Sequence, residues 1–357
     1  MKYTVFGKTG LKVSRLGFGC MRLPYAGGRL DKKESLRIMN IAYERGVSYF
    51  DTAPLYCDNL SEETVGEFLQ GKRDKIVLST KDMGRNEKTF IASFERSFKR
   101  LCTDYIDVFH LWAMNLAAFK TVKGDKGLLE YLYRAKKEGR IRHIAFSFHD
   151  EKPDNVKEVI DSGICETMLL SYNMINPVNG KWLDYAHGKG MGTVIMNPVA
   201  GGTLADADDA ALSSQKVRIA LKYAFTRPYV DIAISGMSSE KQVIENCETA
   251  AGDYAFTADE ERLFSEISAA HKSLLELYCT GCNYCTGCKA DIGIPEIFRL
   301  YNKARMGAGM GWVDAKDIYA KLPVKADKCT ACGACIKKCP QKLDIISDLK
   351  LCHKALT

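Results

Sequence analysis

Eight cysteines near the C-terminal end have the residue type and the spacing to hold metal. Four lie within residues 279–288 and are separated by two residues each, and four more lie within residues 329–339, the last directly before Pro340. Thiolate sulfur is a soft ligand, and each cubic [4Fe–4S] cluster needs four such ligands. Two sets of four therefore predict two [4Fe–4S] clusters. The cysteines are Cys279, Cys282, Cys285, Cys288, Cys329, Cys332, Cys335 and Cys339.

The second set has the spacing of bacterial ferredoxins, including the Cys-Pro that ends it. In that pattern the fourth cysteine of one run ligates the other cluster. We therefore assign Cys279, Cys282, Cys285 and Cys339 to one cluster, and Cys329, Cys332, Cys335 and Cys288 to the other. A two-residue gap precedes Cys288, where a ferredoxin often has three residues.

Zinc sites and disulfides are the alternatives for these cysteines. Two four-cysteine zinc sites would also use Cys-x2-Cys pairs, but they explain neither the third cysteine of each run nor the Cys-Pro. Disulfides are disfavoured because no secretory segment is evident. The pattern thus favours iron–sulfur over zinc, and zinc over disulfides. Tandem clusters are typical of an electron relay, so the rest of the chain is expected to hold the site that uses the electrons.

A length of 357 residues suits one large and one small domain, which we expect at 1–268 and 269–357. Apolar runs are too short to cross a bilayer, and the first residues lack an apolar targeting core, so we expect a cytoplasmic protein with no membrane partner. Residues 271–357 hold 14 Lys and Arg against 8 Asp and Glu, out of a total net charge of +7. This local excess suits anionic clusters or an acidic electron carrier. Without a basic stripe and interleaved aromatics, nucleic acid is not expected as a partner.

A short apolar run followed by a helical pattern recurs eight times before residue 250. Helical spacing is evident at 35–45, 92–101 and 155–161. Short runs rich in Val, Ile and Phe are typical of strands buried on both faces. Eight such units predict a (β/α)8 barrel followed by a small ferredoxin-like domain. A doubly wound sheet is the alternative, but Gly17-Phe18-Gly19 lacks the third glycine of its phosphate-binding turn. The runs are 15–20, 48–53, 75–81, 105–112, 141–147, 167–173, 192–198 and 231–236.

Titratable and aromatic residues follow several of these runs, where a barrel places its catalytic groups. Asp51 ends the second run and Tyr56 follows it, while Lys81 ends the third. His110 and Trp112 lie two apart on the fourth and so share a face. A lysine beside a tyrosine favours the phenolate, and an aspartate would pair with the lysine. We therefore expect Tyr56 to act as a general acid.

Residues 1–250 resemble the aldo/keto reductases, and with the cysteine runs the whole chain resembles the iron–sulfur branch of that family. The resemblance rests on 6–19, on Phe50-Asp51-Thr52-Ala53 with Tyr56, and on Thr80-Lys81. It also rests on 141–147, 197–202 and 236–239 with Glu245-Asn246.

The resemblance implies a nicotinamide cofactor, with Tyr56 donating a proton to a carbonyl oxygen while Asp51 and Lys81 tune it. It implies that Ser147 holds the nicotinamide amide, and that Ser238, Ser239 and Lys241 can meet a 2′-phosphate, which favours NADP over NAD. The cofactor contacts that it implies are Cys20, Met21, Asp51, Ser147, Phe148, Asn197, Pro198, Val199, Ala200, Gly201, Gly236, Ser238, Gln242, Glu245 and Asn246.

Two positions depart from the family pattern at the hydride site. Trp112 stands where the family keeps its catalytic histidine, and Leu169 stands where relatives usually have glutamine. His110, on the same face, is a candidate catalytic residue that could reach inward from one layer deeper. We favour a buried, hydrogen-bonded His110, with the oxyanion donor either absent or replaced by the Trp112 indole N–H.

The sequence thus predicts an iron–sulfur oxidoreductase of aldo/keto reductase type. It would act on a small carbonyl or alcohol with NAD(P)H, with electrons relayed through the clusters from ferredoxin or flavodoxin, or with both. The alternative is a lyase or isomerase on the same barrel, whose clusters are structural or regulatory.

Overall fold

The computed structural model describes residues 1–357 except 85, 151, 206–208, 272–276, 278 and 307–309. The chain forms two compact units. The first comprises Met1–Tyr172, Pro177–Pro198 and Ala220–Ala255, and the second comprises Asn173–Asn176, Val199–Ile219 and Phe256–Thr357. Helix α10 (Ala258–His271), which the sequence-based division assigned largely to the first domain, lies in the second unit.

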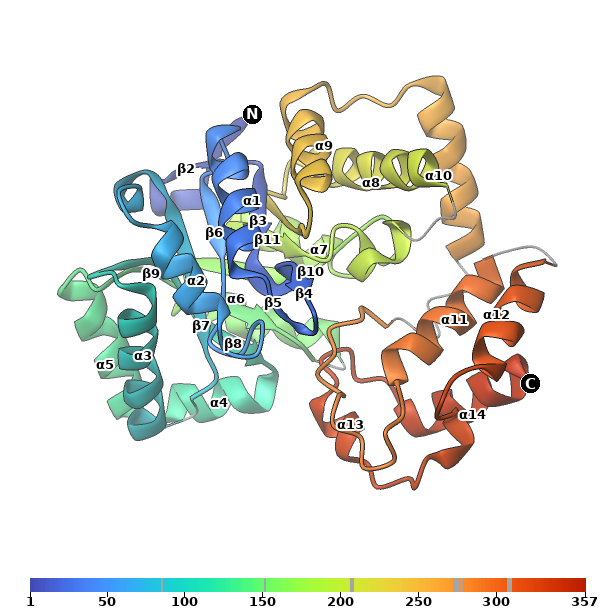
Figure 1. Cartoon of the computed structure of the whole chain (residues 1–357). Helices are drawn as coiled ribbons and strands as arrows, with labels where there is room; N and C mark the ends of the chain where they lie inside the picture. Colours follow the sequence, from blue (N-terminus) through green and yellow to red (C-terminus); the bar gives the residue numbers. More distant parts are fainter. Residues whose placement is uncertain (85, 151, 206–208, 272–276, 278, 307–309) are drawn as a thin grey trace. The chain divides into compact units, whose positions relative to one another are not determined.

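Eight parallel strands close the predicted barrel in the first unit (Figure 1). Their order around the barrel is β3-β6-β7-β8-β9-β10-β11-β12, and β12 pairs with β3 to complete the ring. Gly17 and Gly19 lie where β3 meets β12, and a Cβ on Gly19 would lie 2.8 Å from the Ile234 side chain. The Gly-x-Gly of the sequence therefore marks close packing inside the barrel. The strands are β3 (Leu16–Gly19), β6 (Tyr49–Asp51), β7 (Val77–Asp82), β8 (Ile106–Met114), β9 (Ile141–Phe148), β10 (Thr167–Ser171), β11 (Gly192–Met196) and β12 (Ile232–Gly236).

Helices connect successive strands, as the repeated pattern predicted. Several begin at a side chain that accepts a hydrogen bond from a backbone N–H of the first turn, such as Asp31 for α1 and Asn86 for α3. Because Asn86 caps α3, that helix starts before the predicted 92. The helices are α1 (Lys32–Glu44), α2 (Ser61–Phe68), α3 (Glu87–Leu101), α4 (Leu116–Gly124), α5 (Lys126–Lys137), α6 (Val156–Asp161), α7 (Gly180–Gly188), α8 (Ala210–Phe225) and α9 (Glu240–Ala251).

Two short antiparallel hairpins accompany the barrel: β1 (Tyr3–Val5) with β2 (Lys12–Ser14), and β4 (Tyr25–Ala26) with β5 (Arg29–Leu30). Phe6 follows β1 and is buried against Tyr49 in the barrel core. The first hairpin thus carries an aromatic side chain into the barrel core.

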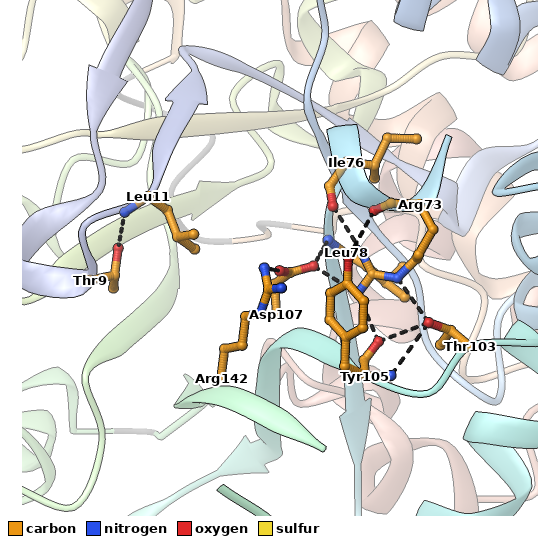
Figure 2. Close-up of polar contacts among 9 residues, drawn as sticks. All are labelled: Thr9, Leu11, Arg73, Ile76, Leu78, Thr103, Tyr105, Asp107 and Arg142. Atoms are coloured by element: carbon orange, nitrogen blue, oxygen red, sulfur yellow. Dashed lines mark hydrogen bonds and ion pairs between the residues drawn. The ribbon is translucent and has the colours of Figure 1, made fainter. Parts of the chain in front are cut away.

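A buried carboxylate ties three strands together at the start of β8 (Figure 2). Asp107 is 1 % exposed and accepts hydrogen bonds from Arg73 at 2.8 Å, Arg142 at 2.7 Å and the Leu78 backbone N–H at 2.9 Å. The two guanidinium groups lie 3.7 and 4.2 Å from the centre of the Tyr105 ring. These groups lie at the N-terminal end of the strands, away from the end where a barrel carries its chemistry, so we assign them to stability.

The second unit contains helices around a separate apolar core. Helices α11 (Ile294–Met306), α12 (Met310–Ala320) and α14 (Ile345–Leu356) pack on one another, and the short α13 (Ala334–Lys338) carries Cys335 and ends directly before Cys339. Helix α11 begins at Ile294, with Pro295 in its first turn, where the missing N–H of proline costs no helical hydrogen bond. Helix α8 begins at Ala210, and residues 206–208 lie outside the described residues.

Among the described helices, none combines the length and the hydropathy that a bilayer crossing requires.

Candidate functional site

Asp51 and Lys81 form a buried ion pair at the ends of neighbouring strands. Lys81 Nζ lies 2.5 Å from Asp51 Oδ1 and also donates to the Thr52 carbonyl at 3.0 Å. The Ser79 hydroxyl donates to the same carboxylate at 2.7 Å. Tyr49 and Val77 belong to the barrel core, and side chains alternate along a strand, so Asp51 and Lys81 both project into the barrel.

Two aromatic rings complete this group. Lys81 Nζ lies 5.4 Å from the centre of the Tyr56 ring, and the Trp112 ring stands perpendicular to Tyr56 with the centres 5.8 Å apart. Both rings are nearly buried. The structure thus brings together four of the five catalytic residues that the sequence proposed.

The turn after Tyr56 is strained. Cys57, Asp58 and Asn59 have φ values of 51°, 56° and 69°, a left-handed conformation that costs about 1–2 kcal/mol per residue. The Cys57 thiol donates to the Cys20 carbonyl at 3.4 Å, and the Tyr25 hydroxyl donates to Asp58 at 2.9 Å. These contacts hold the turn that carries Tyr56. Sequence reasoning missed them; Asp58-Asn59, residue types that tolerate this conformation, was the available signal.

His110 lies in the barrel wall beneath Trp112 and is fully buried. Neither of its ring nitrogens makes a hydrogen bond of normal geometry, which corrects the expectation of a hydrogen-bonded histidine. Burial, and then the Lys81 ammonium, hold the pKa of His110 well below its usual 6.5, while the Phe146 backbone acts weakly in the other direction. His110 is therefore a neutral, buried imidazole. On β8, Trp112 lies nearer than His110 to the C-terminal end of the strand.

Ser147 contacts the backbone of the neighbouring strand, in addition to the contact with a nicotinamide amide that the resemblance implies. Its hydroxyl oxygen accepts a hydrogen bond from the Ala113 N–H at 2.9 Å, and Ala113 has a left-handed φ of 52° at an irregularity in the β8–β9 pairing. The hydroxyl proton of Ser147 can still be donated. Phe148 is nearly buried beside it, and Leu169 belongs to the barrel core.

The residues expected at the adenosine end occupy the end of β12 and the start of α9. Gln242 accepts from the Ser238 N–H at 2.8 Å and from its hydroxyl at 3.2 Å. Asn246 donates to Ser235 at 3.2 Å, and Glu245 pairs with Lys241 at 3.7 Å. Gly236 lies against the Arg22 side chain, where a Cβ would come within 3.1 Å of Arg22 Cδ.

Cys20 and Met21 begin a 3-10 helix, η2 (Cys20–Arg22), at the end of β3. Burial raises the pKa of the Cys20 thiol well above its usual value, and the Asp51 and Cys57 groups add to it. Met21 is partly exposed. Cys20 is thus a buried neutral thiol beside the ion pair.

The loop after β11 is divided between the two units. Asn197 donates to the Ser171 hydroxyl at 3.4 Å in the first unit, whereas Val199, Ala200 and Gly201 belong to the second unit. A Cβ on Gly201 would lie 2.2 Å from the Thr280 carbonyl oxygen, and its φ is +68°. Gly201 belongs to the loop that the resemblance places beside the pyrophosphate of a nicotinamide cofactor. This loop therefore also packs against the segment between Cys279 and Cys282.

The first set of cysteines lines one cavity. It includes Cys279, Cys282, Cys285 and Cys339, with apolar walls from Ile294, Pro295, Phe298, Leu343 and Ile345. Burial raises the pKa of Cys285 to about 12, and the neighbouring Cys279, Cys282 and Cys339 sulfurs add to it. A bound metal would reverse this balance by favouring the thiolates. The structure thus gathers the four sulfurs assigned to one cluster, including Cys339 from the distant run.

The second set is more exposed. Burial raises the pKa of Cys335, and the Cys329 and Cys288 sulfurs add to it. Cys332 is exposed, and hydrogen bonds from the Ala334 backbone and from Thr330, with the nearby Lys289 ammonium, lower its pKa.

Among the described residues, no three His, Cys, Asp or Glu side chains are arranged to hold a single metal ion. Cys279, Cys282, Cys285 and Cys339 line one cavity whose other walls are largely apolar. The Gly281 N–H also donates to the Cys279 sulfur at 3.4 Å, a contact that adjusts the potential of such a cluster. The residues present therefore fit a cubic cluster.

Comparison with known proteins decides the family. The aldo/keto reductase family model matches residues 15–218, more than half of the chain. The chain belongs to the aldo/keto reductase family. A second model, the 4Fe-4S dicluster domain, matches residues 278–343. The chain is thus an oxidoreductase-family enzyme that joins a reductase barrel to a dicluster domain.

Individual relatives agree with this aldo/keto reductase assignment. L-galactose dehydrogenase from Arabidopsis thaliana is 28 % identical over 74 % of this chain and 92 % of its own length. Aldo-keto reductase YhdN from Bacillus subtilis is 30 % identical over 57 % of this chain and 64 % of its own length. The structure of aldo-keto reductase AKR11C1 from Bacillus halodurans, in its holo form, superimposes with a TM-score of 0.63 at 26 % identity and covers 75 % of this chain and 96 % of its own.

Proposed function

We propose that this aldo/keto reductase interconverts a small carbonyl compound and its alcohol, using NAD(P)H, electrons relayed through two [4Fe–4S] clusters, or both. The observation that carries the proposal is the buried Asp51–Lys81 pair near the Tyr56 ring, in a chain where Cys279, Cys282, Cys285 and Cys339 line one cavity.

Tyr56 is the proposed proton donor to the carbonyl oxygen. The Lys81 ammonium lies 5.4 Å from its ring centre and stabilises negative charge that develops on the phenol oxygen as the proton leaves. Asp51 holds Lys81 in place, because the ammonium donates to its carboxylate at 2.5 Å. Trp112 packs on Tyr56 and keeps water from the ring.

A nicotinamide, when bound, supplies hydride to the carbonyl carbon. We propose that Ser147 donates its hydroxyl proton to the nicotinamide amide, since its oxygen already accepts from Ala113. Ser238, Gln242 and Asn246 are the proposed contacts at the adenosine end, where Gln242 accepts from Ser238 and Asn246 donates to Ser235. NADP is favoured over NAD through Ser238, Ser239 and Lys241.

The two sets of cysteines would hold the clusters, which supply single electrons when present. Cys279, Cys282, Cys285 and Cys339 form the proposed first set, and Cys288 with Cys329, Cys332 and Cys335 the second. Fourteen cysteines in 357 residues also support a reducing, cytoplasmic setting.

Anaerobic purification followed by metal analysis and titration with NADPH and NADH tests the proposal. We expect about eight irons per chain, little zinc, and binding of at least one nicotinamide cofactor. Zinc without iron would overturn the cluster assignment. Tyr56→Phe should abolish turnover while cofactor binding persists; retained turnover would move the proton donor elsewhere.

Trp112 and Leu169 favour one second candidate, a lyase or isomerase on the same barrel. The indole and the core leucine remove two polar contacts that the family pattern places at the hydride site. This candidate predicts binding of neither NADPH nor NADH, so binding of either one in the same titration would count against it, whereas no binding would favour it or an electron route without nicotinamide.

A further inference from the structure

The two cysteine sets differ in their access to solvent. Cys339 of the first set is 9 % exposed and belongs to the apolar core of the second unit. The cavity of this set is walled by Ile294, Phe298 and Leu343. Cys332 of the second set is exposed. A partner protein that exchanges electrons with a cluster must come close to it. The second cysteine set is the one that such a partner can reach from solvent.

Exposed lysines surround the second set. Lys289 directly follows Cys288, Lys328 directly precedes Cys329, and Lys337 lies two residues after Cys335. The Lys338 ammonium donates to the Thr286 carbonyl at 3.4 Å, a contact that brings the loop before Lys289 beside α13. Two exposed acidic residues lie close to these lysines along the chain, Asp291 and Asp327, and Asp327 lies 3.4 Å from Lys328 in an exposed pair that contributes little. The face is therefore positively charged.

We propose that the face formed by Lys289, Lys328 and Lys337 around Cys332 docks an acidic one-electron carrier protein. This inference rests on the proposed function, because it assumes a cluster on the second set. The reduced carrier loses one electron, and the metal group held by the second set gains it; no bond is formed or broken. Opposite charges speed such encounters and orient the partner, and interfaces of this kind are small and transient.

Charge reversal at this face tests the proposal. The full, iron-loaded chain is titrated with an acidic flavodoxin, and binding is measured at low and high salt. Lys289→Glu with Lys337→Glu should weaken binding about tenfold or more at low salt and flatten the salt dependence. Lys350→Glu, an exposed lysine on α14, is the matched control and should bind within about twofold of the parent.

The outcome is separable from that of the proposed function. Reduction of the double variant by dithionite, a small reductant that needs no docking face, should match that of the parent. Unchanged flavodoxin binding in the double variant, or equal weakening in the control, would overturn the docking face. Lysine-dependent binding without any electron transfer to nicotinamide would instead leave the face in place and count against the proposed function.

Discussion

Replacing Lys81 with methionine separates the stability of the barrel from its chemistry. Lys81 and Asp51 are 1 % and 5 % exposed at their side chains, and they lie 2.5 Å apart. Lys81→Met would leave the Asp51 carboxylate buried with the Ser79 hydroxyl as its remaining recorded side-chain partner. Removing one member of a buried pair typically costs about 3–5 kcal/mol, because the other charge stays in the interior uncompensated. We expect a loss of that size in the free energy of unfolding.

A second variant makes the reasoning testable. Removing both charges, in Asp51→Leu with Lys81→Met, leaves no buried charge uncompensated and should recover stability to within about 1 kcal/mol of the parent. Arg37→Met is the surface control: its pairs with Glu34 and Glu240 are exposed, so it should cost less than about 1 kcal/mol.

Urea unfolding, followed by tryptophan fluorescence, measures these stabilities under anaerobic conditions. Reduction of a small aldehyde measures the chemistry, which should be lost in both Lys81 variants. The reasoning is refuted if Lys81→Met costs less than about 1 kcal/mol, or if the double variant is no more stable than the single one. Turnover that survives in the double variant would remove Lys81 from the mechanism.

Three further predictions concern the rest of the chain. Asp107→Asn should lower the free energy of unfolding by about 3 kcal/mol or more in urea titrations, because Arg73 and Arg142 both lose their carboxylate partner. Cofactor binding should stay unchanged. A loss below about 1 kcal/mol would contradict the network of Figure 2. The pKa of His110 is held below 6.5 in the folded chain, so below about pH 6.5 the unfolded chain binds more protons, and stability should fall by up to about 1.4 kcal/mol per pH unit as the pH drops. His110→Leu should remove that part of the slope in unfolding measured from pH 7.5 down to about pH 5; an unchanged slope would assign it to other groups. Gly201→Ala should reduce iron content toward about half, since its Cβ would meet the Thr280 backbone beside the first cysteine set. Gly163→Ala, with a similar φ of +69° but open surroundings, is the control, and full iron in both variants would contradict this account.

Much of the barrel could be predicted because each strand and helix carries its own local pattern. The apolar runs that contain Asp51 and Lys81 are strands, and strand ends are where a barrel gathers its side chains, so the pair followed from position alone. The cysteine spacing likewise predicted that Cys339 lies with the first run. Both inferences use local sequence patterns, namely the apolar runs and the spacing of the cysteines within each run.

The parts that sequence reasoning missed depend on contacts between distant residues. The hydroxyl of Ser147 accepts from Ala113 because an irregularity in the β8–β9 pairing turns that N–H toward it. The ring nitrogens of His110 make no hydrogen bond of normal geometry, although the Lys81 ammonium acts on the imidazole from the neighbouring strand, and the strand of His110 by itself reveals neither fact. The contact of Gly201 with Thr280 joins segments that are about 80 residues apart, and a Gly-Gly pair alone gives no hint of it.

One measurement tests the proposed function most directly, in the form in which a nicotinamide and the clusters both take part and exchange electrons. The iron-loaded chain is reduced anaerobically with dithionite, freed of excess reductant and mixed with NADP⁺ or NAD⁺, and the reverse reaction is run with NADPH and the oxidised chain. Two clusters that each carry one electron hold two electrons, the equivalent of one hydride. We therefore predict up to about one reduced nicotinamide per chain, formed as the visible absorbance of the oxidised clusters returns. In the reverse reaction, NADPH should bleach that absorbance. A chain that binds the nicotinamide yet exchanges no electrons with it in either direction would contradict the account.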